Sequence, residues 1–146
     1  MESSDIALVQ QSFAKVWPIK ARAAEIFYAD LFQTAPEVRP LFEETDMARQ
    51  GGKLMQTLNT VVKGLNDLPA LLPVAADLAS RHVDYGVTPA HYDSVGASLL
   101  RTLEAGLGEA FTPEVRAAWT TAYTTLSGAM IGAAYPPEPP AASGTS

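Results

Sequence analysis

The stretch IFYADLFQTAPEVRPLF, residues 26–42, contains the pattern that decides the fold class. Apolar side chains recur in it every three or four residues, which predicts an amphipathic helix from about Lys20 to Thr34. Ala35-Pro36 ends this helix because a residue that precedes proline avoids the α region. A short helical piece from Glu37 to Phe42 follows. Since no period-two alternation separates these segments or occurs elsewhere, we expect an all-α fold.

The helical spacing continues on both sides of this stretch. Before it, the pattern predicts a helix that has Asp5 as its N-cap and ends at Pro18. After it, the polar residues 43–47 predict a loop, and a new apolar stripe predicts a helix that ends near Leu65. The next helix is expected over residues 69–86. Its apolar stripe begins near Pro69, and Gly86 marks its end.

Two Thr-Pro pairs predict where the last two long helices begin. Thr88-Pro89 and Thr112-Pro113 each place an N-cap residue directly before a first-turn proline. The run PPEPPAASGTS, residues 136–146, contains too little apolar surface to fold. We therefore expect one folded domain over residues 1–135 and a disordered tail over residues 136–146.

Composition excludes several classes of function. The chain has 146 residues and a net charge of -6, and its Lys and Arg residues form no cluster, so nucleic acid and membrane surfaces are not expected as partners. It contains no cysteine, which excludes disulfides, thiolate nucleophiles, iron–sulfur clusters and covalent haem attachment. The N-terminus is acidic, unlike a signal peptide, and the apolar run at residues 68–76 is too short to span a membrane. We expect a cytoplasmic protein.

The two histidines are the strongest nitrogen ligands in the chain. His82 continues the apolar stripe of Leu71, Ala75 and Leu78, whereas His91 falls in the first turn of a helix, a position that usually faces solvent. The pattern therefore predicts that only His82 points into the core. A metal ligand and a core histidine bound to a backbone carbonyl both fit this pattern.

Tyr28 and Gln50 place hydrogen-bond donors on stripes that are otherwise apolar. A buried donor without a partner costs about 1–3 kcal/mol, so these groups should bind one another, the backbone or a polar ligand. The alternative is that the Tyr28 hydroxyl reaches the surface and that Gln50 is a solvated residue in the first turn of its helix.

Six short stretches together resemble the single-domain bacterial globins of the flavohaemoglobin family, most of all those of thermophilic and acidophilic bacteria. Their order and spacing are more specific than any one of them, and they cover nearly the whole chain apart from the tail. The stretches are IFYADLFQTAPEVRPLF (26–42), QGGKLMQ (50–56), LPALLP (68–73), RHVDYGV (81–87), HYDSVGASLL (91–100) and AWTTAY (118–123).

This resemblance implies a globin fold around one non-covalent haem b. It makes His82 the proximal iron ligand and places Tyr28 and Gln50 on the distal side, where they would act on the bound ligand. A hydrogen bond from His82 to the carbonyl of Leu78 would orient the imidazole. The further cofactor contacts that we expect are Phe42, which stacks on the haem, Leu54, Tyr92, Val95 and Tyr123, with Lys53 and Arg81 as partners of the propionates or simply as solvated side chains.

Two departures from the family pattern bear on function. In relatives whose proximal histidine donates electron density strongly to the iron, a carboxylate in the last helix bonds that histidine. In this chain no acidic residue lies between Glu114 and Glu138, and the aligned position is Ala134. This disfavours a peroxidase-like role. The chain also ends where flavin and nicotinamide domains would begin, and it has no G-x-G-x-x-G, since residues 106–111 fit a helix end. Redox turnover should therefore need a separate reductase.

The leading hypothesis is a haem protein that reversibly binds oxygen for transport, storage or sensing, with nitric oxide and carbon monoxide as further gas ligands. The Tyr28 and Gln50 pair is equally compatible with a nitric oxide dioxygenase that depends on a separate reductase. A haem-free helical interaction module, in which His82 is structural, is the third hypothesis.

Overall fold

The computed structural model describes residues 2–42, 46–84 and 89–134, and all secondary structure in these ranges is helical. The fold is all-α, as predicted. Three short 3-10 segments, η1 (Trp17–Ile19), η2 (Pro36–Phe42) and η3 (Gly108–Ala110), separate longer helices. The α-helices of the described ranges are α1 (Ser3–Val16), α2 (Lys20–Thr34), α3 (Met47–Gly64), α4 (Leu68–Asp84), α5 (Pro89–Leu107) and α6 (Pro113–Ala134).

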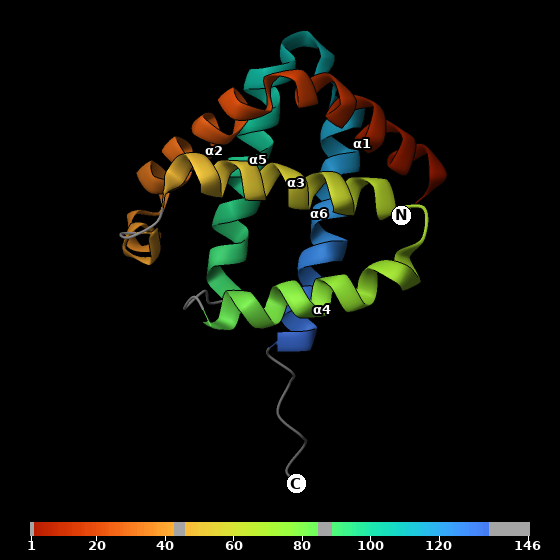
Figure 1. The fold of residues 1–146 in the computed structure, drawn as a ribbon. Coiled ribbons are helices and arrows are strands. Elements are labelled where there is room, and N and C mark those ends of the chain that lie inside the picture. Colours follow the sequence, from red (N-terminus) through yellow and green to blue (C-terminus); the bar gives the residue numbers. More distant parts are fainter. Residues whose placement is uncertain (1, 43–45, 85–88, 135–146) are drawn as a thin grey trace, which may run out of the picture.

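The helices pack in crossing layers. Figure 1 shows α3 and α4 crossing in front of α5 and α6, with α1 and α2 above them. The most extensive contacts join α1 to α6, α2 to α5, and α4 to α6. In the described ranges, no helix is long and apolar enough to cross a membrane.

A buried aromatic cluster joins α1 to α6. The ring of Phe13 lies 6.0 Å from that of Trp17 and 6.2 Å from that of Trp119, measured between centroids. Trp119 donates from its indole nitrogen to the Ser12 hydroxyl at 2.8 Å, so its one polar atom is satisfied inside the core. These contacts hold the first helix, α1, against the last helix, α6.

Most helix boundaries agree with the sequence-based expectations. The helices α2 and η2 lie where residues 26–42 predicted them, and α5 and α6 begin at Pro89 and Pro113. The Thr112 hydroxyl accepts from the Val115 N–H at 3.2 Å, as an N-cap residue does. Thr88, the predicted helix end at Gly86 and the predicted tail at residues 136–146 lie outside the described residues.

Two boundary predictions need correction. Asp5 is not the N-cap of the first helix, because α1 begins at Ser3 with Glu2 as its N-cap. Asp5 lies inside the first turn, where its carboxylate accepts from the Glu2 N–H at 3.3 Å. The predicted loop at residues 43–47 ends earlier, since the Asp46 carboxylate accepts from the N–H groups of Ala48 and Arg49 and α3 therefore begins at Met47.

Candidate functional site

The helix α4 positions His82 through an apolar stripe one to three turns before it. Leu71 and Ala75 on this stripe are buried, and Leu78 is half-buried. The His82 Nδ1 atom lies 2.6 Å from the carbonyl oxygen of Leu78, as predicted. Because a carbonyl can only accept, Nδ1 carries the proton, and the lone pair of a neutral imidazole is then on Nε2. This is the tautomer in which a histidine presents Nε2 to a metal.

Contacts from α5 and α6 support the ring of His82. The Tyr92 ring stacks on it at 6.1 Å between centroids, with 28° between the planes. Tyr123 on α6 donates from its hydroxyl to the Tyr92 carbonyl, and burial raises the Tyr123 pKa, so the hydroxyl keeps its proton. A Cβ at Gly96 would lie 2.6 Å from the Tyr123 ring, so glycine allows this close packing. His82 on α4 therefore contacts α5 directly, and α6 holds its partner Tyr92 in place.

Tyr28 lies inside a cluster of aromatic rings at the end of α2. Its side chain is only 8% exposed, and its ring centroid lies 5.0 Å from Phe27, 5.9 Å from Phe32 and 5.6 Å from Phe42. Burial raises the Tyr28 pKa, while a hydrogen bond with the Gln50 side chain acts in the opposite direction. The hydroxyl is thus buried beside Gln50 and does not reach the surface.

The crossing of α2 and α3 brings Tyr28 and Gln50 together. A Cβ built on Gly51 would lie 2.9 Å from the Cβ of Ala24, so glycine is what allows the two helices to approach this closely. Gln50, the residue before this contact, is half-buried and interacts with Tyr28 one turn beyond Ala24. The two polar residues that interrupt separate apolar stripes therefore converge.

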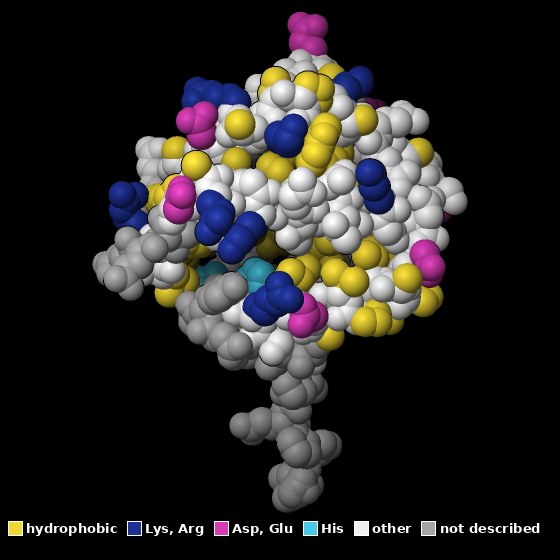
Figure 2. Space-filling view, viewed as in Figure 1, with side chains coloured by type: hydrophobic (Ala, Val, Ile, Leu, Met, Phe, Trp, Pro, Cys, Tyr) yellow, Lys and Arg dark blue, Asp and Glu magenta, His cyan; other side chains and the backbone are white. Residues whose placement is uncertain are grey.

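A hollow opens between α3 and α4. Figure 2 shows histidine side chains inside it, with basic side chains over the first half of α3 and over α4 at its edge. Lys53 on α3 and Arg81 on α4 are both exposed. Arg81 pairs with Asp77 at 2.9 Å, an exposed i,i+4 pair, so this side chain already has a local anion partner.

The remaining predicted apolar site residues all pack against the main core. Phe42 joins the aromatic cluster of Tyr28, with its ring 5.5 Å from that of Phe32. Leu54 and Val95 are half-buried and pack against the main core. Tyr123 braces α6 against α5, as described above.

The prediction that only His82 points inward needs correction. His91 is half-buried, as His82 is, because the start of α5 lies beside the end of α4 (Figure 1). Burial therefore does not distinguish the two histidines. The contacts that position His82 are its bond to the Leu78 carbonyl and its stacking on Tyr92.

The sequence-based reasoning did not single out Gly51 or Gly96 as site residues. Each allows a close approach that positions a site residue, Gln50 in one case and Tyr92 in the other. A glycine inside a strong helical pattern is the signal that could have identified them, because glycine lowers helix stability and needs a packing reason.

In the described ranges the chain is thus all-helical, with histidine side chains in a hollow between α3 and α4 and a hydrogen-bonded Tyr–Gln pair where α2 crosses α3. The globin family model matches residues 25–130. The chain belongs to the globin family.

Bacterial flavohemoproteins are similar to this chain over its globin region. Identity is 32% over 108 residues with the flavohemoprotein of Bacillus subtilis, 37% over 110 residues with that of Bordetella parapertussis, and 34% over 107 residues with that of Vibrio cholerae. These matches cover 73%, 73% and 72% of this chain and 27% of each relative. The matched region therefore spans about a quarter of the length of these relatives.

Proposed function

We propose that this chain holds one non-covalent haem b in the hollow between α3 and α4 and reversibly binds a diatomic gas, above all oxygen. The observation that carries the proposal is the state of His82. Its Nδ1 donates to the Leu78 carbonyl at 2.6 Å, which is the tautomer in which Nε2 would ligate the haem iron. Haem held this way supplies an iron atom at which oxygen, carbon monoxide or nitric oxide can bind.

The surroundings of His82 favour gas binding over peroxidase-like chemistry. The hydrogen-bond partner of Nδ1 is a neutral carbonyl, and no acidic residue lies between Glu114 and Glu138 to replace it with a carboxylate. A carboxylate would draw the imidazole towards imidazolate, whereas a carbonyl leaves it neutral. The His82 ring is oriented by the Leu78 carbonyl and by the Tyr92 ring.

Tyr28 and Gln50 fit the role of distal hydrogen-bond donors. Burial keeps the Tyr28 hydroxyl protonated, and the Gln50 amide that interacts with it carries two donor hydrogens in all. A gas ligand that acquires negative charge would be held by both groups, and their apolar aromatic surroundings strengthen such bonds. Carbon monoxide gains less, so the pair would select for oxygen.

Six further residues are proposed to contact the haem or its propionates, with Tyr92 described above as the residue that stacks on His82. Phe42 and Leu54 would supply the apolar walls of the cofactor site, with Val95 and Tyr123 behind it. Lys53 and Arg81 are exposed on α3 and α4, the two helices whose basic side chains border the hollow, and they would pair with the cofactor's propionates. For Arg81 this means exchanging Asp77 for a propionate, which is an inexpensive change for an exposed pair.

An absorbance spectrum of the purified, haem-reconstituted protein tests the proposal. We expect a Soret band at one haem per chain, which shifts when the iron is reduced and shifts again under carbon monoxide. A protein that stays colourless after reconstitution, or that gives only the spectrum of free haem, would support a haem-free helical module instead.

A nitric oxide dioxygenase activity is the second candidate, because relatives of this chain are named flavohemoproteins and the Tyr28–Gln50 pair is compatible with this activity too. Nitric oxide, dioxygen and one electron would give nitrate, with the electron supplied by a separate cytoplasmic reductase. The oxygenated chain should consume about one nitric oxide per haem. Added flavin reductase and nicotinamide cofactor should restore turnover, whereas sustained turnover with the nicotinamide cofactor alone would contradict this candidate.

A further inference from the structure

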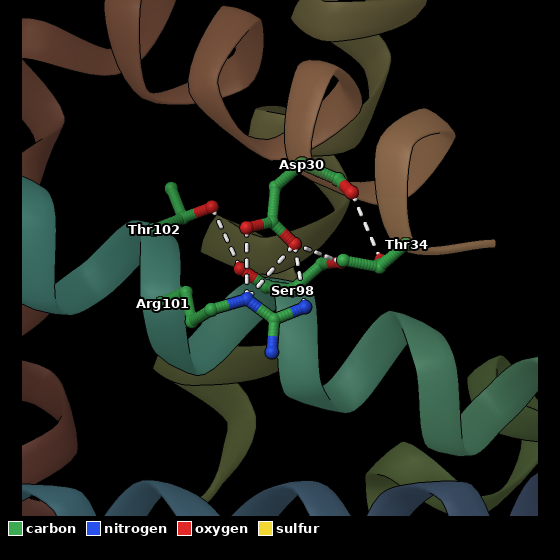
Figure 3. Close-up of polar contacts among 5 residues, drawn as sticks. All are labelled: Asp30, Thr34, Ser98, Arg101 and Thr102. Carbon is green, nitrogen blue, oxygen red and sulfur yellow. Dashed lines mark hydrogen bonds and ion pairs between the residues drawn. The ribbon is translucent and has the colours of Figure 1, made fainter.

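A polar cluster joins α2 to α5 (Figure 3). The Asp30 carboxylate accepts from Arg101 Nε at 2.8 Å through Oδ2 and from Arg101 Nη2 at 2.6 Å through Oδ1. The Ser98 hydroxyl donates to the same carboxylate at 2.7 Å. The Arg101 guanidinium and the Ser98 hydroxyl lower the Asp30 pKa, so the carboxylate is charged at neutral pH.

The cluster is anchored in the backbone of both helices. Ser98 has no exposed surface, and its carbonyl accepts from the buried Thr102 hydroxyl at 2.8 Å. The Asp30 carbonyl accepts from the Thr34 hydroxyl at 2.9 Å. A two-pronged Arg–carboxylate contact fixes direction as well as distance, because the guanidinium is planar and rigid. The cluster therefore specifies how α2 is rotated about its own axis relative to α5.

Rotation of α2 determines where the Tyr28 hydroxyl lies. Tyr28 and Asp30 are two residues apart, which separates their side chains by about 200° around a helix. With Asp30 held against α5, Tyr28 must point towards α3 and η2, where Gln50 and Phe42 meet it. One turn before Tyr28, the close contact between Ala24 and Gly51 holds α2 against α3. The cluster at Asp30 is a second point of attachment on α2, and two such points define the rotation of the helix.

We infer that Asp30, Ser98 and Arg101 form a positioning cluster that holds the Tyr28 hydroxyl against Gln50 and sets how strongly the distal pair binds its ligand. This inference rests on the proposed function for its effect on oxygen. Partly exposed ion pairs add little to global stability, and the Arg101 and Asp30 side chains are 45% and 23% exposed. The cluster should therefore matter more for the position of Tyr28 than for the melting temperature.

The test compares three variants with a matched control. Asp30→Asn removes the charge at nearly constant shape, Arg101→Lys keeps the charge but loses the planar fork, and Ser98→Ala removes the buried donor. Glu25→Gln is the control, because Glu25 lies on the same helix and pairs with Arg22 only at 3.9 Å between exposed side chains. All four proteins are labelled with fluorotyrosine, and the Tyr28 signal is assigned by its loss in Tyr28→Phe.

We expect the fluorine signal of Tyr28 to shift or broaden in the carbon monoxide form of Asp30→Asn and Arg101→Lys, but not of Glu25→Gln. Oxygen release should speed up by about two- to tenfold in the same two variants, since part of a hydrogen bond to a charged acceptor is lost. Carbon monoxide release and the melting temperature should stay close to those of the unmodified protein. Ser98→Ala should show the same effects more weakly.

An unchanged Tyr28 signal together with unchanged oxygen release in both Asp30→Asn and Arg101→Lys would overturn the inference. The proposed function would survive that result as long as Tyr28→Phe itself speeds oxygen release. Conversely, a shifted Tyr28 signal supports the cluster even if oxygen release proves independent of Tyr28. If Asp30→Asn does not fold, Arg101→Lys carries the test, because it retains the ion pair.

Discussion

Tyr28 and Gln50 are polar residues with buried or half-buried side chains, and each carries a donor that a purely structural core would not need. They belong to different helices, and their hydrogen bond is made inside a shell of phenylalanine rings. A leucine at either position would avoid the desolvation of a polar group. Their hydrogen bond satisfies both groups, and the proposed function adds a polar ligand that both could reach.

Removing either donor should speed oxygen release. Tyr28→Phe deletes only the hydroxyl and keeps the ring packing, and Gln50→Leu is its counterpart on α3. A hydrogen bond to a charged acceptor contributes about 1.5–3 kcal/mol, which corresponds to a roughly ten- to hundredfold faster release. Stopped-flow measurement should give this increase for oxygen and a much smaller one for carbon monoxide. Oxygen release within a factor of about two of the unmodified protein in both variants would rule out the distal assignment.

The raised pKa of Tyr28 makes a prediction about pH. Burial favours the neutral phenol, so the hydroxyl should remain a donor well above neutral pH and begin to ionise only above the ordinary tyrosine range near 10. Oxygen release from the unmodified protein should therefore be constant between about pH 6 and pH 9. An increase within that range that disappears in Tyr28→Phe would mean that Tyr28 ionises earlier than its burial predicts.

At the scale of elements, the α2–α3 crossing determines whether the distal pair forms. Gly51 faces Ala24 so closely that a Cβ would lie 2.9 Å from the Ala24 Cβ, whereas a Cβ at the exposed Gly52 has no heavy atom within 4 Å. The two neighbouring glycines of α3 therefore form a natural matched pair for testing the crossing.

Gly52→Ala should stabilise the protein by about 0.5–1 kcal/mol, because alanine is the better helix former. Gly51→Ala should lose this gain and about 1–3 kcal/mol more, because the helices must separate. It should also speed oxygen release as Gln50 moves away from Tyr28. Chemical denaturation and stopped-flow measurement check the two effects. Equal stabilisation by both substitutions would show that α2 and α3 are not in close contact.

The sequence predicted the elements better than the contacts between them. Apolar spacing and Ala35-Pro36 located α2 and η2, and the Thr-Pro pairs located the starts of α5 and α6, because these signals are local. Asp5 was misassigned because a carboxylate can cap a helix from inside the first turn as well as from in front of it. The Asp30–Arg101 contact joins residues 71 positions apart, which no periodicity reveals.

At the scale of the whole molecule, the globin match at residues 25–130 lies within the domain that we propose for residues 1–135. The tail at residues 136–146 was expected to be disordered because it consists mainly of proline and small residues, and that expectation stays a prediction. Truncation after Pro136 should leave the haem spectrum unchanged and shift the melting temperature by less than about 2 °C, the shift expected for a few tenths of a kcal/mol. A large drop in either would mean that the tail packs on the domain.

The central claim is that His82 binds the haem iron, and the two histidines of the chain allow a direct test. His82→Ala should fail to retain haem, or should regain a Soret band only when imidazole is added to fill the vacated ligand position. His91→Ala, the matched control on α5, should keep the spectrum of the unmodified protein. A native Soret band in His82→Ala without imidazole, together with its loss in His91→Ala, would contradict the account.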